Sequence, residues 1–172
     1  MSDQPFNGIS KSAVFWPTLI VVYAADFVTK RLVVASLSPA YVPHQIVGDF
    51  IRFTLAYNRD AAMGLSLGEY SRAGFTITAA AVLIVLFALY RKTPSSGLVS
   101  VVALAMIAGG ALGNLTDRLM SPLGVVDFID VGKGNARFWT FNLADAAVTC
   151  GAILLALVSM KRDDKSEQEV VP

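Results

Sequence analysis

Four long apolar segments constrain this chain more than any other feature of its sequence. They lie at about 14–36, 71–90, 97–119 and 140–160, and each is long enough to cross a bilayer as a helix. Hydrophobic residues make up 55% of the chain and charged residues only 16%, with a mean hydropathy of +0.58. A soluble domain of 172 residues has too small an interior to bury that much apolar surface. We therefore predict an all-α membrane protein with four transmembrane helices.

The chain length predicts one domain. We expect a single membrane-embedded domain over residues 1–165 and a charged, flexible tail over residues 166–172. The net charge of +1 and the lack of a long basic run argue against a nucleic-acid partner. One cysteine and one histidine exclude an internal disulfide and make a poor zinc site, so we expect no metal and no cofactor.

Positive charges at the ends of the apolar segments indicate the orientation. Arg91-Lys92 and Lys161-Arg162 directly follow the second and fourth segments, and such clusters favour the cytoplasmic side. Both termini are then cytoplasmic. The two longer connections, about 37–70 and 120–139, face outward.

The first long connection contains a strand pattern. Ile51, Phe53, Leu55 and Tyr57 alternate with more polar residues, which predicts a strand with one apolar face. The segment that follows, residues 61–65, fits a short amphipathic helix lying on the membrane surface.

Ionisable residues inside the apolar segments need an explanation, because each costs about 2.5–3.5 kcal/mol on insertion scales. Asp26 and Lys30 are four residues apart in the first segment, so they share a helix face and suit a structural ion pair. Asn114, Asp117 and Arg118 share one face near the end of the third segment. Asp117 and Arg118 equally suit ordinary interfacial positions near a helix end. An interfacial role and a role in a polar site therefore both remain open.

A third group of polar residues surrounds the start of the fourth segment. Asn142 and Asp145 lie in its first turns, with Asp145 about five residues inside, and Asp127 and Asp130 lie in the preceding loop. Asp145 has no cation within one turn of its own helix. Two neighbouring carboxylates have coupled titrations, so one can act as a base on water while the other acts as an acid. Two aspartates 18 residues apart remain a weak signal for such a pair.

Five stretches of the sequence resemble the lipoprotein signal peptidases, the signal peptidase II family. They follow the order and nearly the spacing of that family through most of the chain, and together they are specific. They are Asp26-Phe27-Val28-Thr29-Lys30, Tyr57-Asn58-Arg59-Asp60-Ala61-Ala62, Gly109-Gly110-Ala111-Leu112-Gly113-Asn114-Leu115-Thr116-Asp117-Arg118, Val125-Val126-Asp127-Phe128-Ile129-Asp130 and Phe141-Asn142-Leu143-Ala144-Asp145.

The resemblance implies a membrane aspartyl endopeptidase with Asp127 and Asp145 as its catalytic dyad. It implies that four residues line the site or hold the substrate, namely Asn58, Asn114, Arg118 and Asn142, and that Asp26, Lys30 and Asp117 are structural. The implied substrate is a prolipoprotein carrying a diacylglyceryl group on cysteine, cut just before that cysteine. The resemblance also implies an extracytoplasmic β-cradle and a surface helix within residues 37–70.

The same resemblance implies a location and partners. We expect a multi-pass protein of the bacterial cytoplasmic membrane, with its active site toward the extracytoplasmic face. Membrane lipids and the lipid-modified substrate are its partners, and we expect a monomer.

The chain departs from the family pattern at two positions. Asp60 stands where members usually have glycine, and Met63 stands where they have an aromatic residue. Methionine fills an apolar slot flexibly, but Asp60 adds a charge beside the expected cradle. These departures put the local loop conformation and the substrate range in doubt, without affecting the dyad.

Two other functions fit part of this sequence pattern. A small proton-coupled transporter or channel subunit also places carboxylates in a bundle, but it needs polar residues along a path through the membrane. A structural or assembly protein leaves the gathering of Asn, Asp and Arg side chains toward one side unexplained.

Overall fold

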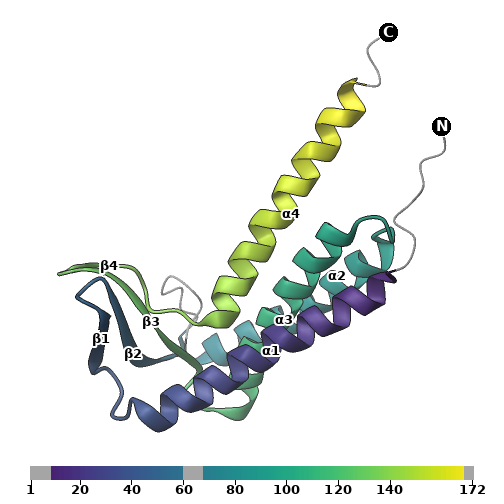
Figure 1. Cartoon of the computed structure of the whole chain (residues 1–172). Helices are drawn as coiled ribbons and strands as arrows, with labels where there is room; N and C mark the ends of the chain where they lie inside the picture. The colour runs from purple at the N-terminus through teal and green to yellow at the C-terminus, as the bar shows by residue number, and fades with distance from the viewer. Residues whose placement is uncertain (1–8, 60–67, 169–172) are drawn as a thin grey trace.

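The computed structural model describes residues 9–59 and 68–168, which form a helical bundle with a small sheet at one end (Figure 1). The helices are α1 (Lys11–Ser36), α2 (Ser71–Lys92), α3 (Leu98–Met120) and α4 (Leu143–Gln168), and a 3-10 turn, η2 (Gly68–Tyr70), precedes α2. The strands are β1 (Pro43–Val47), β2 (Ile51–Asn58), β3 (Val125–Lys133) and β4 (Ala136–Arg137).

Helix α3 is the centre of the bundle and contacts each of the other three helices. Small residues allow these close approaches. A Cβ at Gly109 would lie 2.9 Å from a carbonyl of α1, and one at Gly110 would overlap the carbonyl of Ala144 at the start of α4. The glycines of α3 therefore bring α1 and α4 close enough for their polar side chains to meet.

Within the described part of the chain, three helices are long and apolar enough to cross a membrane: Ala73–Lys92, Leu98–Met120 and Leu143–Lys161. Helix α1 begins, and α4 ends, at the same end of the bundle (Figure 1). At that end Lys11 caps α2, because its ammonium group donates to the carbonyls of Tyr90, Arg91 and Thr93 at 2.8–3.1 Å.

The sheet lies at the opposite end, where α1 ends and α4 begins (Figure 1). Its four antiparallel strands follow the order β1-β2-β3-β4. The central pair joins segments far apart in the sequence, with Ala56 opposite Asp127 and Asn58 opposite Val125. Val126 and Phe128 of β3 pack with Leu55 and with Val33 of α1, which fixes the sheet to the bundle.

The predicted helical membrane protein with a small antiparallel sheet is confirmed at this level. The loop expected at Asp127 and Asp130 is wrong, because both residues lie on strand β3. The first four residues of β3 are all buried, so they lack the polar alternation that marks a half-exposed strand. Helix α4 continues to Gln168, three residues into the expected tail. The expected surface helix at 61–65 lies outside the described residues, as do Asp60 and Met63.

Candidate active site

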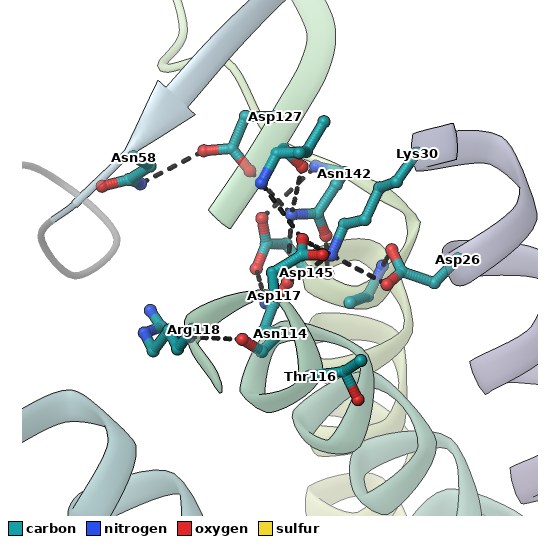
Figure 2. Close-up of polar contacts among 12 residues, drawn as sticks. Asp26, Lys30, Asn58, Asn114, Thr116, Asp117, Arg118, Asp127, Asn142 and Asp145 are labelled. Atoms are coloured by element: carbon teal, nitrogen blue, oxygen red, sulfur yellow. Dashed lines mark hydrogen bonds and ion pairs between the residues drawn. The ribbon is translucent and has the colours of Figure 1, made fainter. Parts of the chain in front are cut away.

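Asp127 faces the bundle from strand β3 and is held by two side-chain amides (Figure 2). Asn58 is the diagonal neighbour of Asp127 across the β2–β3 pair, so both side chains emerge on one face. Its Nδ2 donates to Asp127 Oδ2 at 3.1 Å, and Nδ2 of Asn142 donates to Asp127 Oδ1 at 2.6 Å. Both oxygens of this carboxylate are therefore positioned by neutral donors.

Asp145 lies in the first turn of α4, which corrects the expectation of a position five residues inside the span. Asn142 immediately precedes the helix and caps it. The Asp145 N–H donates to Asn142 Oδ1 at 2.9 Å, and the Asn142 N–H donates to Asp145 Oδ2 at 3.3 Å. This reciprocal pair is a capping box. The Asn-x-x-Asp spacing signals it in the sequence, but the apolar window that began at residue 140 concealed the start of the helix.

The amide of Asn142 lies between the two aspartates and is fully buried. Its Nδ2 group contacts Asp127, while its Oδ1 atom and backbone N–H contact Asp145. Two positions 18 residues apart in the sequence are thereby joined through one side chain. Asn142 is not among the residues that line the cavity described below, so it orients the carboxylates from behind.

Helix α3 adds Asn114 and Arg118 from one face. Asn114 Nδ2 donates to Asp145 Oδ1 at 2.8 Å, and its Oδ1 accepts from Asn142 at 3.2 Å and from Lys30 at 2.8 Å. Arg118 donates to the Asn114 carbonyl at 3.2 Å. Both residues line the cavity that the aspartates face.

Behind these amides lies the buried ion cluster of Asp26, Lys30 and Asp117 (Figure 2). The ammonium group of Lys30 lies 2.8 Å from Asp26 Oδ2 and 3.0 Å from Asp117 Oδ2, which confirms the predicted Asp26–Lys30 pair. Asp26 also accepts the N–H of Ala144, and Asp117 accepts the N–H of Val126. The cluster thus fixes the start of α4 and the start of β3, the two segments that carry the aspartates.

A cavity of about 1050 Å³ opens in front of the two aspartates. Asp127 and Asp145 lie on its polar side with Asn58, Asn114 and Arg118. Its remaining walls are largely apolar. They include the 138–141 segment before α4 and residues 146 and 148–150 of α4 itself, and they are completed by Tyr41, Ala56, Tyr57, Arg59, Leu123 and Val125.

Sequence analysis missed the wall formed by residues 138–141. Phe138 and Trp139 are more than half exposed and form an edge-to-face pair. The run Phe-Trp-Thr-Phe before an apolar helix was the available signal, since exposed aromatic residues mark binding surfaces and membrane interfaces.

The electrostatic surroundings of Asp127 suit proton exchange near neutral pH. Burial raises the pKa of Asp127, the nearby Asp145 raises it further, and the value reaches about 7. The hydrogen bonds from Asn58 and Asn142 oppose this rise but do not cancel it. Two carboxylates that share a cavity, one of which titrates near 7, can supply a proton and accept one.

Comparison with known proteins identifies the fold and its class. The family model described as signal peptidase (SPase) II matches residues 18–161. The chain belongs to the signal peptidase II family. It is 41% identical over 160 residues to the lipoprotein signal peptidase of Streptomyces coelicolor, covering 90% of this chain and 74% of that protein. It is 40% identical over 154 residues to the lipoprotein signal peptidase of Ectopseudomonas mendocina, covering 87% and 89%.

Two solved structures share the architecture of this signal peptidase II member. Both are described as bacterial membrane enzymes. One has a TM-score of 0.77 at 30% identity, covering 91% of this chain and 92% of its own. The other has a TM-score of 0.73 at 31% identity, covering 84% and 91%. The helices and sheet described above are therefore those of a membrane-embedded peptidase, and the transporter alternative receives no support.

Proposed function

We propose that this protein is an aspartyl endopeptidase that removes the signal peptide from diacylglyceryl-modified prolipoproteins, cutting before the lipidated cysteine. One observation carries the aspartyl assignment: Asp127 and Asp145 come from different elements, face one cavity and both accept hydrogen bonds from Asn142, from its side chain and its backbone N–H respectively. Family membership supports the peptidase and its lipoprotein substrate.

The dyad activates water without a metal. Asp145, which accepts hydrogen bonds from Asn114 and Asn142, is the charged base that removes a proton from water as its oxygen attacks the scissile carbonyl carbon. Asp127, whose pKa is about 7, holds the proton and gives it to the carbonyl oxygen. When the tetrahedral intermediate collapses, Asp145 gives its proton to the leaving nitrogen and the C–N bond breaks. One hydroxyl of the intermediate returns its proton to Asp127 as the carbonyl re-forms. Arg118 and Asn58 line the cavity, which supports a role for both in holding the substrate backbone.

The cavity suits a substrate that arrives within the membrane. Ala146, Val148 and Cys150 line it and belong to the apolar part of α4, so the cavity extends from the aspartates toward the lipid. A prolipoprotein anchored by its signal helix and acyl chains diffuses in the bilayer plane and enters from that side. Membrane lipids are therefore partners, and we propose that a monomer is sufficient because one chain supplies both aspartates.

Helix α1 is proposed as the fourth transmembrane helix of the single domain. Large apolar side chains are exposed along its length, including Trp16, Ile20, Val21 and Leu32, and its charged Asp26 and Lys30 are buried against α3. Four spans put both termini on one side of a bacterial membrane, and Arg91-Lys92 and Lys161-Arg162 favour the cytoplasmic side. The dyad then lies at the extracytoplasmic face, with the sheet as the cradle over the substrate.

The test is cleavage of a lipid-modified prolipoprotein by the purified protein in detergent or liposomes. Asp127→Asn and Asp145→Asn are each expected to reduce product formation by at least about 10³-fold, because each removes a proton-transfer group while preserving shape. The matched control is Asp49→Asn, a change in the turn between β1 and β2 and outside the cavity, which is expected to retain activity. Substantial cleavage by either dyad variant would contradict the proposed aspartyl mechanism.

A further inference from the structure

The amide groups around the dyad have only one orientation that satisfies their neighbours. Lys30 carries three N–H donors and no acceptor, and all three donors are used, by Asp26, Asp117 and Asn114. Asn114 must therefore turn its Oδ1 atom toward Lys30. Its NH₂ group then faces Asp145, to which it donates at 2.8 Å.

A flipped Asn114 amide would create two repulsive contacts. Its NH₂ group would face the Lys30 ammonium, placing donor against donor, and its Oδ1 would face the Asp145 carboxylate, placing acceptor against acceptor. The ammonium of Lys30 is almost fully buried, so water does not relieve such a clash. Lys30 thus decides which edge of the amide faces the dyad.

The same logic continues to Asp127. The Asp145 N–H fixes Asn142 Oδ1, so the NH₂ group of Asn142 points to Asp127 and to Asn114 Oδ1. A continuous chain of oriented hydrogen bonds runs from Lys30 through Asn114 to Asp145, with Asn142 linking it to Asp127.

We propose that Lys30, although it lies outside the cavity, is a positioning residue of the dyad: it holds the Asn114 amide in the orientation that stabilises the charged, base form of Asp145. This inference rests on the proposed aspartyl mechanism. It assigns Lys30 a role in the reaction beyond the structural ion pair with Asp26.

The charged groups around Asp145 come from three elements. They are Asp26 and Lys30 from α1, Asp117 and Arg118 from α3 and Asp127 from β3, and Arg59 lines the same cavity. Removing Lys30 changes the charge near Asp145 as well as the orientation of Asn114. The experiment therefore has to separate these two effects.

The experiment measures kcat, KM and the pH profile of cleavage for Lys30→Met, Asn114→Leu and the double variant. Lys30→Met is expected to lower kcat by about 10²-fold, as does removal of one preorganised donor in other enzymes, and to leave KM unchanged because Lys30 does not line the cavity. The acidic limb of the profile moves to higher pH, since a base whose charged form has lost its donor binds a proton more readily. The double variant should be no slower than Asn114→Leu alone.

Two further variants keep the test decisive. Asp26→Asn/Lys30→Met leaves the net charge of the cluster unchanged and retains an acceptor for the Ala144 N–H, so it replaces Lys30→Met if that variant fails to insert, and it also separates orientation from charge. Asn114→Asp keeps an acceptor toward Lys30 but removes the donor to Asp145, and it should also lower kcat. Lys11→Met is the matched control, because Lys11 also donates three hydrogen bonds but lies at the other end of the bundle.

The outcomes separate this inference from the proposed function. Activity in Asp127→Asn or Asp145→Asn overturns the aspartyl mechanism, and the role of Lys30 with it. If both are inactive, a wild-type kcat and pH profile in the Lys30 variants overturns this inference alone. Losses that multiply in the double variant also overturn it, because they show that Lys30 does not act through Asn114.

Discussion

Strand β3 carries two buried aspartates that differ in almost every physical respect. Asp127 and Asp130 are three residues apart, on either side of the point where the β2–β3 register shifts. Asp127 faces the cavity and Asp130 faces a charged cluster in the sheet. The same strand therefore presents one carboxylate to a site and another to a structural contact.

Asp130 is neutralised by cations. Arg52, directly opposite it on β2, and Arg137 on β4 each form an ion pair with its carboxylate, and Thr54 adds a hydrogen bond at 3.1 Å. Burial raises the pKa of Asp130, but the hydrogen bonds from Arg137, Arg52 and Thr54 outweigh burial and hold the pKa below its ordinary value.

Asp127 is held by the side-chain amides of Asn58 and Asn142 and lies near Asp145, and its pKa is raised to about 7. Neutral donors fix the position of a carboxylate without fixing its charge, whereas arginines fix both. The contrast shows how one strand separates a group suited to proton exchange from a group suited to holding strands together.

The largest expected effect comes from exchanging the two aspartates for asparagine. Asp127→Asn should abolish cleavage while leaving the free energy of unfolding at neutral pH unchanged or higher, because it removes a poorly compensated buried charge. Asp130→Asn should retain the activity of the folded fraction but lower the free energy of unfolding by about 3 kcal/mol, since it removes the buried carboxylate that pairs with two arginines.

Thermal unfolding in detergent, together with cleavage per folded molecule, checks this pair of outcomes. The assignment of a catalytic role to Asp127 and a structural role to Asp130 is contradicted if Asp130→Asn abolishes cleavage without loss of stability, or if Asp127→Asn is the less stable variant.

A second prediction concerns the pH dependence of stability. The folded pKa of Asp127 lies above the unfolded value of about 3.9. The folded state therefore binds the extra proton between about pH 4 and pH 7, and Asp127 lowers stability as pH rises through that window, by up to about 1.4 kcal/mol per pH unit. The folded pKa of Asp130 is depressed, so its contribution is present above pH 4 and is lost as pH falls below it.

Unfolding free energies measured between pH 3 and pH 8 test this opposition. Relative to the natural protein, Asp127→Asn should gain stability as pH rises from 4 to 7, and Asp130→Asn should show its deficit mainly above pH 4. Parallel curves for all three proteins would contradict the opposite roles.

The sequence predicted those structural features that depend on the spacing of residues close together in the chain. Apolar runs indicated the helices, and the four-residue spacing of Asp26 and Lys30 predicted their ion pair. The ion cluster at Asp130 was not predicted. Arg52 and Asp130 are 78 residues apart in the sequence and meet only through the register of β2 and β3. Strand β3 was not predicted either, because its first four residues are all buried and the sequence there lacks the alternation of polar and apolar residues.

The site was predictable as a set of residues but not as a geometry. Asp127, Asp145 and three of the four predicted substrate-binding residues line one cavity, whereas Asn142 lies behind the two aspartates. Its capping box with Asp145 was readable from the sequence once the helix start was known. The orientation of the amides depends on donors from three elements, which no local pattern contains.

The smallest expected effect compares the neutral donors that β2 supplies to the two aspartates. Thr54→Val removes a hydrogen bond to Asp130 and should lower the free energy of unfolding by about 1 kcal/mol, with kcat and the pH profile unchanged. Asn58→Leu removes a donor to Asp127, and because that hydrogen bond lowers the pKa of Asp127, its loss raises the pKa further. An acid that holds its proton to higher pH moves the basic limb of the cleavage profile upward. Equal stability losses with no change in either profile would mean that β2 treats both carboxylates as structural, and that the amides at Asp127 do not tune its proton.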